Sequence, residues 1–188
     1  MKDYKKEGKI KGSLKIEGNL ILTGDLEVEQ EIEVAGYIDC KGYWIEAGYW
    51  IEAGYSIKAG DWIEAGYWIE AGYSIKAGDW IKAGHSIEAG HSIESGGWIE
   101  AGGSILSQLW IKCGTTLSAG IYIYAGIKTW GERTEEDMLI ECGKLESGKV
   151  EFGNLVETGI EKPEEMIELD GKKYSKSTLK EALKKYVE

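Results

Sequence analysis

The chain has 188 residues with 27 Gly, eight Trp and eleven Tyr but one Pro and one Phe, a composition that excludes a mainly helical protein and a disordered one. Its net charge is −11, and residues 13–130 carry most of it, with 16 acidic residues against seven lysines. Direct binding of nucleic acid along this region is therefore not expected.

Residues 1–12 are basic, with five lysines against two acidic residues. Aliphatic pairs such as Leu14 with Ile16 follow, in the alternation of one strand face. We therefore expect a basic N-terminal arm over 1–12 and a β-solenoid from residue 13. The first residues lack the apolar core of a signal peptide, and no apolar run approaches twenty residues, so we expect a cytoplasmic protein without a membrane span.

From residue 43 to residue 113 the chain repeats a six-residue unit: aromatic or Ser, Ile, Glu or Lys, Ala, Gly, variable. The isoleucines recur every six positions, at Ile45, Ile51, Ile57, Ile63, Ile69, Ile75, Ile81, Ile87, Ile93, Ile99, Ile105 and Ile111. A fixed short period is typical of a solenoid, in which each unit buries its apolar side by stacking on its neighbours. Ile38 and Ile45 are seven apart, which indicates one inserted residue at a bulge or wider corner.

A period of eighteen residues is superimposed on the period of six. The aromatic position reads Trp, Trp, Ser twice in succession, and Asp61 and Asp79 lie eighteen apart. Three units therefore make one coil, and the sequence predicts an all-β fold. This fold is a three-sided parallel β-solenoid over residues 13–160, with about eight coils spaced about 4.8 Å apart. Isoleucine and alanine should point inward, with glycine at each corner because its backbone adopts angles that a Cβ resists.

Six outward tryptophans should align in two columns, one of Trp44, Trp62, Trp80 and Trp98 and one of Trp50 and Trp68. At the spacing of a sheet such rings form an offset stack. In one interpretation they only shield the backbone and stabilise the stacking of coils. In the other they form a binding surface for a protein, a glycan or stacked bases, because exposed apolar bands of this size usually mark an interface.

Two acidic columns run along the same body, one with Glu46 and Glu64 and one with Glu52, Glu70 and Glu88. Like charges one strand apart repel each other, although Lys58, Lys76 and Lys82 lie near in the sequence. Calcium sites usually bring together about six or more oxygens. We therefore interpret the columns as solvated faces and predict neither a metal nor a cofactor.

No residue pattern indicates an enzyme. His85 and His91 occupy the variable corner position, as a histidine of the hexapeptide acyltransferases would, but here the large Ile precedes the small Ala and the long active-site loop is missing. Phosphate-binding loops, dinucleotide fingerprints and nucleophile elbows are also lacking. Cys40, Cys113 and Cys142 occupy the alanine position and should be small buried residues.

Residues 161–188 predict a β-hairpin, with an Asp-Gly turn at 170–171, and then a helix. The apolar face of that helix carries Leu179, Leu183 and Tyr186. The end of a solenoid exposes unpaired strand edges, so a cap is one role for this region. Binding of a partner or formation of a homodimer is the other.

The repeated phrases Ser-Ile-Lys-Ala-Gly, Ser-Ile-Glu-Ala-Gly and Trp-Ile-Glu-Ala-Gly resemble a family of uncharacterised repeat proteins from gut bacteria, their phages and mobile elements. Residues 121–159 resemble the region that follows the repeat in that family. The segment from Ile16 to Leu20 is similar to bactofilins, which form β-helical filaments. The first resemblance implies a phage or mobile-element protein, and the second implies a structural one.

Two hypotheses of function follow. The first is a non-enzymatic inhibitor, such as an anti-CRISPR protein, that binds a host protein of defence or nucleic-acid handling by imitating nucleic acid. Duplex DNA carries about one charge per 1.7 Å, so mimicry requires one concentrated acidic face, or the tryptophans must do the binding. The second is a structural filament or virion component. A glycan-binding rod would use the same tryptophans but should be secreted.

Overall fold

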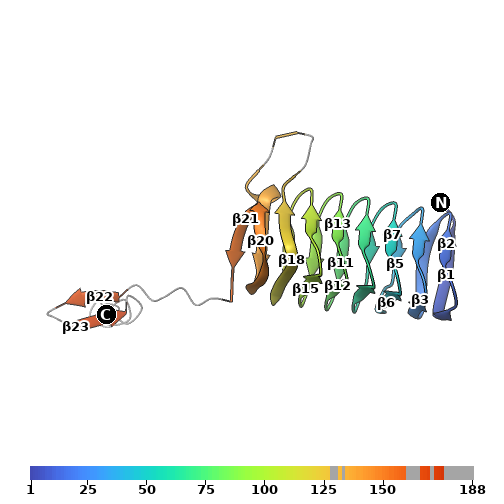
Figure 1. Ribbon diagram of the computed structural model, residues 1–188, viewed down its shortest axis with the longest axis horizontal. Helices are drawn as coiled ribbons and strands as arrows, with labels where there is room; N and C mark the ends of the chain where they lie inside the picture. Colours follow the sequence, from blue (N-terminus) through green and yellow to red (C-terminus); the bar gives the residue numbers. More distant parts are fainter. Residues whose placement is uncertain (128–130, 133, 160–165, 170–171, 176–188) are drawn as a thin grey trace, which may run out of the picture.

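The computed structural model describes residues 1–127, 131–132, 134–159, 166–169 and 172–175. Its body is a parallel β-solenoid of about eight coils, stacked along one axis from the N-terminal end (blue in Figure 1) to β20 and β21 (orange). Each strand from β1 to β21 pairs with strands of the neighbouring coils. The predicted all-β parallel solenoid is confirmed.

Most strands have two or three residues. The first are β1 (Asp3–Ile10), β2 (Leu14–Ile16), β3 (Asn19–Val28), β4 (Ile32–Val34) and β5 (Ile38–Asp39). The regular repeats form β6 (Ile45–Ala47), β7 (Ile51–Ala53), β8 (Ile57–Lys58), β9 (Ile63–Ala65), β10 (Ile69–Ala71), β11 (Ile75–Ala77), β12 (Ile81–Ala83), β13 (Ile87–Ala89), β14 (Ile93–Ser95), β15 (Ile99–Ala101), β16 (Ile105–Ser107) and β17 (Ile111–Cys113). The last coils contain β18 (Thr116–Ala125), a 3₁₀ turn η1 (Glu136–Met138), β19 (Leu139–Cys142), β20 (Lys144–Phe152) and β21 (Asn154–Glu157).

Three sides run along the body, and we name them by the residue before each strand. The Trp44 side consists of β6, β9, β12 and β15, and the Trp50 side of β4, β7, β10, β13 and β16. The serine side consists of β5, β8, β11, β14 and β17. Every third strand pairs in parallel, which confirms three units per coil.

The strand register confirms the period of eighteen. Ile63 lies opposite Ile45 on one side and Ile81 on the other. Ile45 lies opposite Leu26, nineteen residues earlier, because one residue is inserted between β5 and β6. The insertion forms a wider corner at Lys41, whose φ is +52°.

The core is a column of isoleucines with a column of small residues beside it. Ile45 through Ile111 are 0 % exposed, and the alanines of the same strands are 1–3 % exposed. Burying each isoleucine contributes about 1.5–3 kcal/mol, and each one packs on copies of itself. Cys40, Cys113 and Cys142 are free and buried, as predicted.

The corner glycines are required for a different reason from the one the sequence suggests. None of the repeat glycines from Gly48 to Gly120 has a positive φ. A Cβ added at Gly66, however, would lie 2.0 Å from the carbonyl oxygen of Gly48 in the previous coil. Glycine therefore allows the backbones of neighbouring corners to approach closely, which the unit spacing does not reveal.

Residues 3–10 do not form the expected arm but the first strand of the solenoid. β1 pairs in parallel with both halves of β3, from Tyr4 opposite Leu20 to Ile10 opposite Val28. Tyr4 and Ile10 pack against the core, and the lysines between them are exposed. A register shift between Lys6 and Gly8 interrupts the alternation, which explains why the sequence pattern missed this strand.

The shorter repeats after residue 139 continue the coil. β19 pairs in parallel with β17 and β21, and β20 pairs in parallel with β18, so this region is a further coil. β22 (Met166–Leu169) and β23 (Lys172–Ser175) form a separate antiparallel sheet where a hairpin was predicted. The predicted helix, with Leu179, Leu183 and Tyr186, lies outside the described residues, and the capping role stays a prediction.

Candidate binding surface

Four tryptophans form a continuous stack on the Trp44 side, which we call the Trp44 ladder. The ring centroids of Trp44, Trp62, Trp80 and Trp98 are successively 4.6, 4.7 and 4.8 Å apart, with interplanar angles of 3–4°. Backbone hydrogen bonds set this spacing: the N–H of Ile45 donates to the Trp62 carbonyl and that of Ile63 to the Trp80 carbonyl. The rings are half-buried, so each presents an edge to solvent.

The Trp50 pair is a shorter stack on the next side. Trp50 and Trp68 lie 4.8 Å apart with an interplanar angle of 7°. Tyr49 and Tyr67, at the corner before them, are 43 % and 50 % exposed. The ring of Tyr67 meets that of Trp68 edge-on at 6.4 Å. These tyrosines widen the aromatic surface beyond the predicted residues, and their recurrence eighteen apart in the variable position was the signal for them.

The acidic columns lie beside the tryptophans, two residues further along the chain. On the Trp44 side, Glu46 lies opposite Glu64, which forms an ion pair with Lys82 at 3.2 Å. Partial burial raises the pKa of Glu46, and repulsion by Glu64 adds to the effect. In this column Glu46 and Glu64 therefore repel each other, and the ion pair with Lys82 partly offsets that repulsion.

On the Trp50 side an ion pair occurs at one end of the column, where Lys15 binds Glu33, the residue opposite Glu52. Glu52, Glu70 and Glu88 lie in register, and no Lys or Arg of the described chain pairs with any of them. Partial burial raises the pKa of Glu52, repulsion by Glu70 and Glu33 adds to the effect, and attraction by Lys15 opposes it. Lys58 and Lys76, which the sequence placed near these columns, lie opposite each other on the serine side instead.

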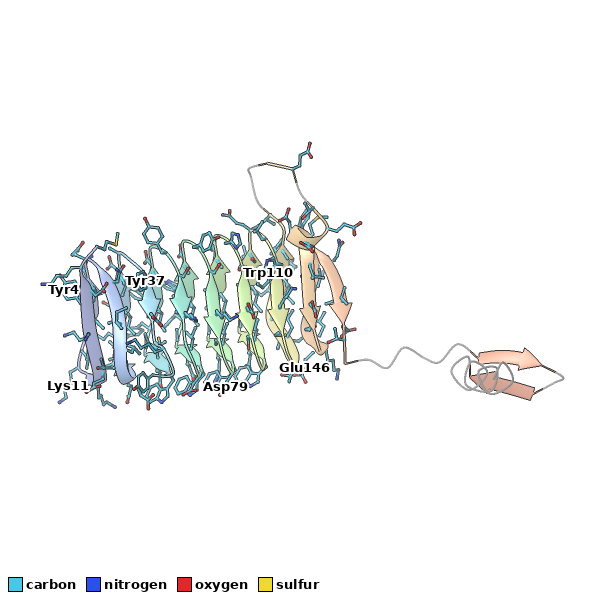
Figure 2. The ribbon with its side chains drawn as sticks, turned by 180° about the vertical axis from the view of Figure 1, so that it is seen from behind. Tyr4, Lys11, Tyr37, Asp79, Trp110 and Glu146 are labelled. Atoms are coloured by element: carbon cyan, nitrogen blue, oxygen red, sulfur yellow. The ribbon has the colours of Figure 1, made fainter. Side chains whose placement is uncertain are left out.

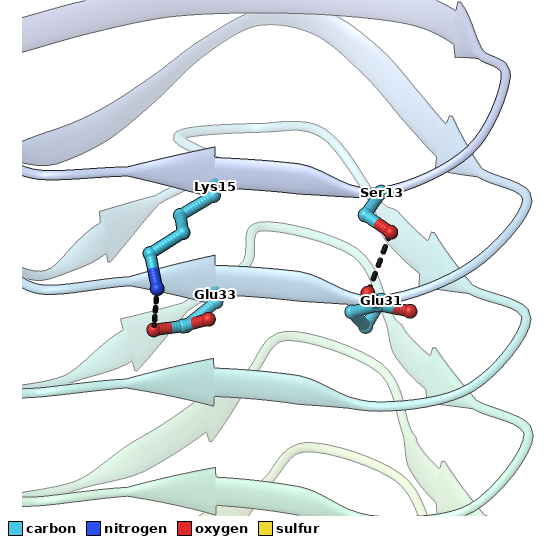
Figure 3. A network of polar contacts seen from close by, with 4 residues as sticks. All are labelled: Ser13, Lys15, Glu31 and Glu33. Carbon is cyan, nitrogen blue, oxygen red and sulfur yellow. Dashed lines mark hydrogen bonds and ion pairs between the residues drawn. The ribbon is translucent and has the colours of Figure 1, made fainter.

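Towards the N-terminal end of the body, polar side chains also pair from coil to coil. Figure 3 shows Lys15 donating to Glu33 at 2.7 Å and the Ser13 hydroxyl donating to Glu31 at 2.5 Å. These groups are exposed, and such pairs contribute at most about 1 kcal/mol each. Only the first of them pairs opposite charges, and it neutralises Glu33, whereas Glu52, Glu70 and Glu88 have no such ion pair among the described residues.

The serine side is less aromatic. Tyr37 and Trp110 lie along one edge of the body, with Asp79 at the opposite edge (Figure 2). Trp110 lies before β17, and the Lys112 ammonium lies 5.3 Å from its ring centroid. Because Ser56, Ser74 and Ser92 separate the two aromatic residues along this column, no ladder forms.

The two histidines continue tyrosine columns. His91 stacks on Tyr73 at 4.4 Å, and the Nδ1 atom of His85 lies 3.1 Å from the Ser86 hydroxyl. They lie at different corners, as the sequence indicates. In the described part of the chain, no group of three or more His, Cys, Asp or Glu side chains is arranged to hold a metal ion.

No family model matches the chain, and comparisons with curated proteins and with solved structures find no similar protein. Among the described residues, no helix has the length and apolar character needed to cross a membrane. The described surface carries two stacks of tryptophans, and each lies beside a column of carboxylates.

Proposed function

We propose that this chain is a non-enzymatic binding protein that attaches to a basic protein partner through the Trp44 ladder. The observation that carries the proposal is the unbroken stack of four half-exposed indole rings, with Glu46 and Glu64 two residues along the same strands. Tryptophan is enriched among residues that dominate binding energy, and carboxylates at the rim steer a basic partner.

Coil stability explains part of the ladder, but it does not favour exposing the ladder to water. An aromatic pair contributes about 0.5–1.5 kcal/mol beyond its buried area, so the three contacts together contribute about 1.5–4.5 kcal/mol. Serines at the same position on the serine side show that a coil forms without a ring there. The exposed edges of the four indoles are therefore available to a partner.

The charge spacing bears on the kind of partner. One carboxylate column offers a charge about every 4.8 Å, whereas duplex DNA offers one about every 1.7 Å. Charge alone is thus about threefold too sparse to imitate a duplex along the whole rod. We propose that the rod covers a local basic patch, such as the nucleic-acid site of a host protein, and that the tryptophans supply the apolar anchor.

The resemblance of the repeats to phage and mobile-element proteins supports an inhibitor that acts inside the host cell. Blocking the basic site of a defence or nucleic-acid-handling protein would require no catalysis. This form of the proposal predicts that the bound partner loses its affinity for nucleic acid.

A structural filament or virion component is the second candidate. Leu155 and Val156 on β21, the last solenoid strand, are 37 % and 45 % exposed. Growth from the other end is opposed by β1, because lysines on an edge strand hinder pairing with another chain. Light scattering at rising concentration tests this candidate, and steady growth in mass would favour it over the binding protein.

The test of the first candidate removes the middle of the ladder. A variant with Trp62→Ser and Trp80→Ser should lose a basic partner captured from host lysate, while Trp110→Ser on the serine side should retain it. Serine occurs at this position in the chain itself, and circular dichroism checks that the coils persist. Retention of the partner by the double variant would show that the ladder is not the binding surface.

A further inference from the structure

The tryptophan column on the Trp50 side ends at Trp68. On this side the residues before successive strands are Trp50, Trp68, Ser86 and Ser104. Trp68 stacks on Trp50, but the next coil offers only the short side chain of Ser86. Among the described residues no ring stacks on the outer face of Trp68, and this residue is 36 % exposed.

A hollow of about 160 Å³ occupies the place of the missing ring. It is lined by Trp68, Ile69, Glu70, His85, Ser86 and Glu88. Rings of the Trp44 ladder follow one another at 4.6–4.8 Å, which defines where the next planar group would stack on Trp68. Such a group would lie at the level of Ser86, on the same coil as Glu88.

Two carboxylates flank this place. Glu70 on β10 lies opposite Glu88 on β13, and both residues are exposed. Neither carboxylate forms an ion pair with a Lys or Arg of the described residues. The hollow thus combines an open indole face with negative charge that no described cation neutralises.

We propose that this hollow binds the guanidinium group of an arginine side chain from a protein partner, stacked on Trp68 between Glu70 and Glu88. A guanidinium is planar, stacks on indole faces and donates in-plane hydrogen bonds to carboxylates. An ammonium lacks the planar shape, and a neutral ring leaves the carboxylates without a partner. The site lies on a different side from the Trp44 ladder and does not depend on the proposed function.

The test compares three capped tripeptides, Gly-Arg-Gly, Gly-Lys-Gly and Gly-citrulline-Gly, titrated into the full chain. Citrulline keeps the planar shape without the charge, and lysine keeps the charge without the plane. The arginine peptide should shift the indole N–H resonance of Trp68 in NMR spectra and bind at least about threefold more tightly than either of the others. Equal binding of the citrulline peptide would overturn the proposal in favour of a neutral planar ligand.

Variants locate the site. Trp68→Ser extends the serine column by one coil and should remove arginine binding, whereas Trp98→Ser shortens the Trp44 ladder and should leave it intact. The double change Glu70→Gln with Glu88→Gln should weaken binding several-fold. The matched change Glu46→Gln with Glu100→Gln alters net charge equally on the other side and should not. An equal effect of the two double variants would reveal general charge attraction and sink the proposal.

The same peptides separate this site from the proposed function. A chain with Trp62→Ser and Trp80→Ser should lose the captured partner but keep the arginine peptide. Loss of the peptide in this variant, with circular dichroism unchanged, would place arginine binding on the Trp44 ladder and contradict the assignment to Trp68.

Discussion

Replacing Gly66 with alanine should destabilise the central coils, whereas the same change at Gly42 should not. A Cβ at Gly66 would lie 2.0 Å from the Gly48 carbonyl oxygen, while one at Gly42 would meet no atom within 4 Å. The two coils would have to separate by about 1 Å to bring this contact to the 3.0 Å that real Cβ atoms tolerate. The central coils have stacked corners on both sides, so they cannot move apart freely.

The expected loss of stability comes from overpacking at the corner and from weakened hydrogen bonds between the two coils. Overpacking costs about 1–3 kcal/mol. The N–H groups of Gly66 and Tyr67 donate to the previous coil at 3.0 and 2.6 Å, and weakening each bond costs about 0.5–1.5 kcal/mol. The lower entropy of the unfolded chain offsets about 0.4–1 kcal/mol. The free energy of unfolding should therefore fall by about 1–6 kcal/mol.

Urea unfolding followed by tryptophan fluorescence and by circular dichroism measures this difference. Gly42→Ala is the matched control, because it makes the same chemical change at a corner with open space, and it should be neutral or slightly stabilising. If the two variants unfolded at the same urea concentration, close approach of the coils would not be the reason for the corner glycines.

Three further perturbations test the packing and the charges. Trp62→Ser removes two ring contacts and should lower the free energy of unfolding by about 1–3 kcal/mol, with loss of near-ultraviolet dichroism; an unchanged spectrum would contradict the stacking. Burial raises the pKa of Cys113 to about 12 and that of Cys142 to about 11, so a thiol reagent near neutral pH should label them only after unfolding, and rapid native labelling would refute their burial. The raised pKa of Glu52 means that the folded state binds the proton of this carboxyl more tightly than the unfolded state does. Protonation of Glu52 therefore stabilises the fold below its ordinary pKa of 4.5, and this stabilisation is lost as the pH rises through the higher folded value. Glu52→Gln should accordingly raise the urea midpoint near neutral pH and have less effect near pH 4.5, and a lower midpoint at neutral pH would contradict the repulsion from Glu70.

The solenoid could be predicted because residues eighteen apart in the sequence are of the same type and stack on each other. Once three units make a coil, Ile63 must lie on Ile45 and Trp62 on Trp44, and both pairs do. A regular alternation of inward and outward side chains is therefore enough to predict which residues are neighbours in adjacent coils. β1 escaped prediction because its register shift and its lysines disguise the alternation of an edge strand.

Other features depend on distances that spacing alone does not give. The corner glycines follow from the close approach of neighbouring coils, which only the wound backbone reveals. The hollow beside Trp68 was in principle visible, since Ser86 follows Trp68 in its column. Its volume and lining depend on how side chains of neighbouring coils are placed, which the spacing of residues does not give.

Stacking identical units places each residue against a residue of the same type. This arrangement stabilises the tryptophan columns and destabilises the carboxylate columns. Indoles gain from self-stacking, whereas like carboxylates repel, and the pKa of Glu52 is raised first by partial burial and then by this repulsion. The chain has a remedy elsewhere, because Lys82 pairs with Glu64 and Lys76 pairs with Glu94. No such lysine lies in the column from Glu52 to Glu88. The negative charge of this column destabilises the free chain, and an arginine from a partner would neutralise it. Glu70→Lys should therefore both stabilise the free chain and abolish arginine binding.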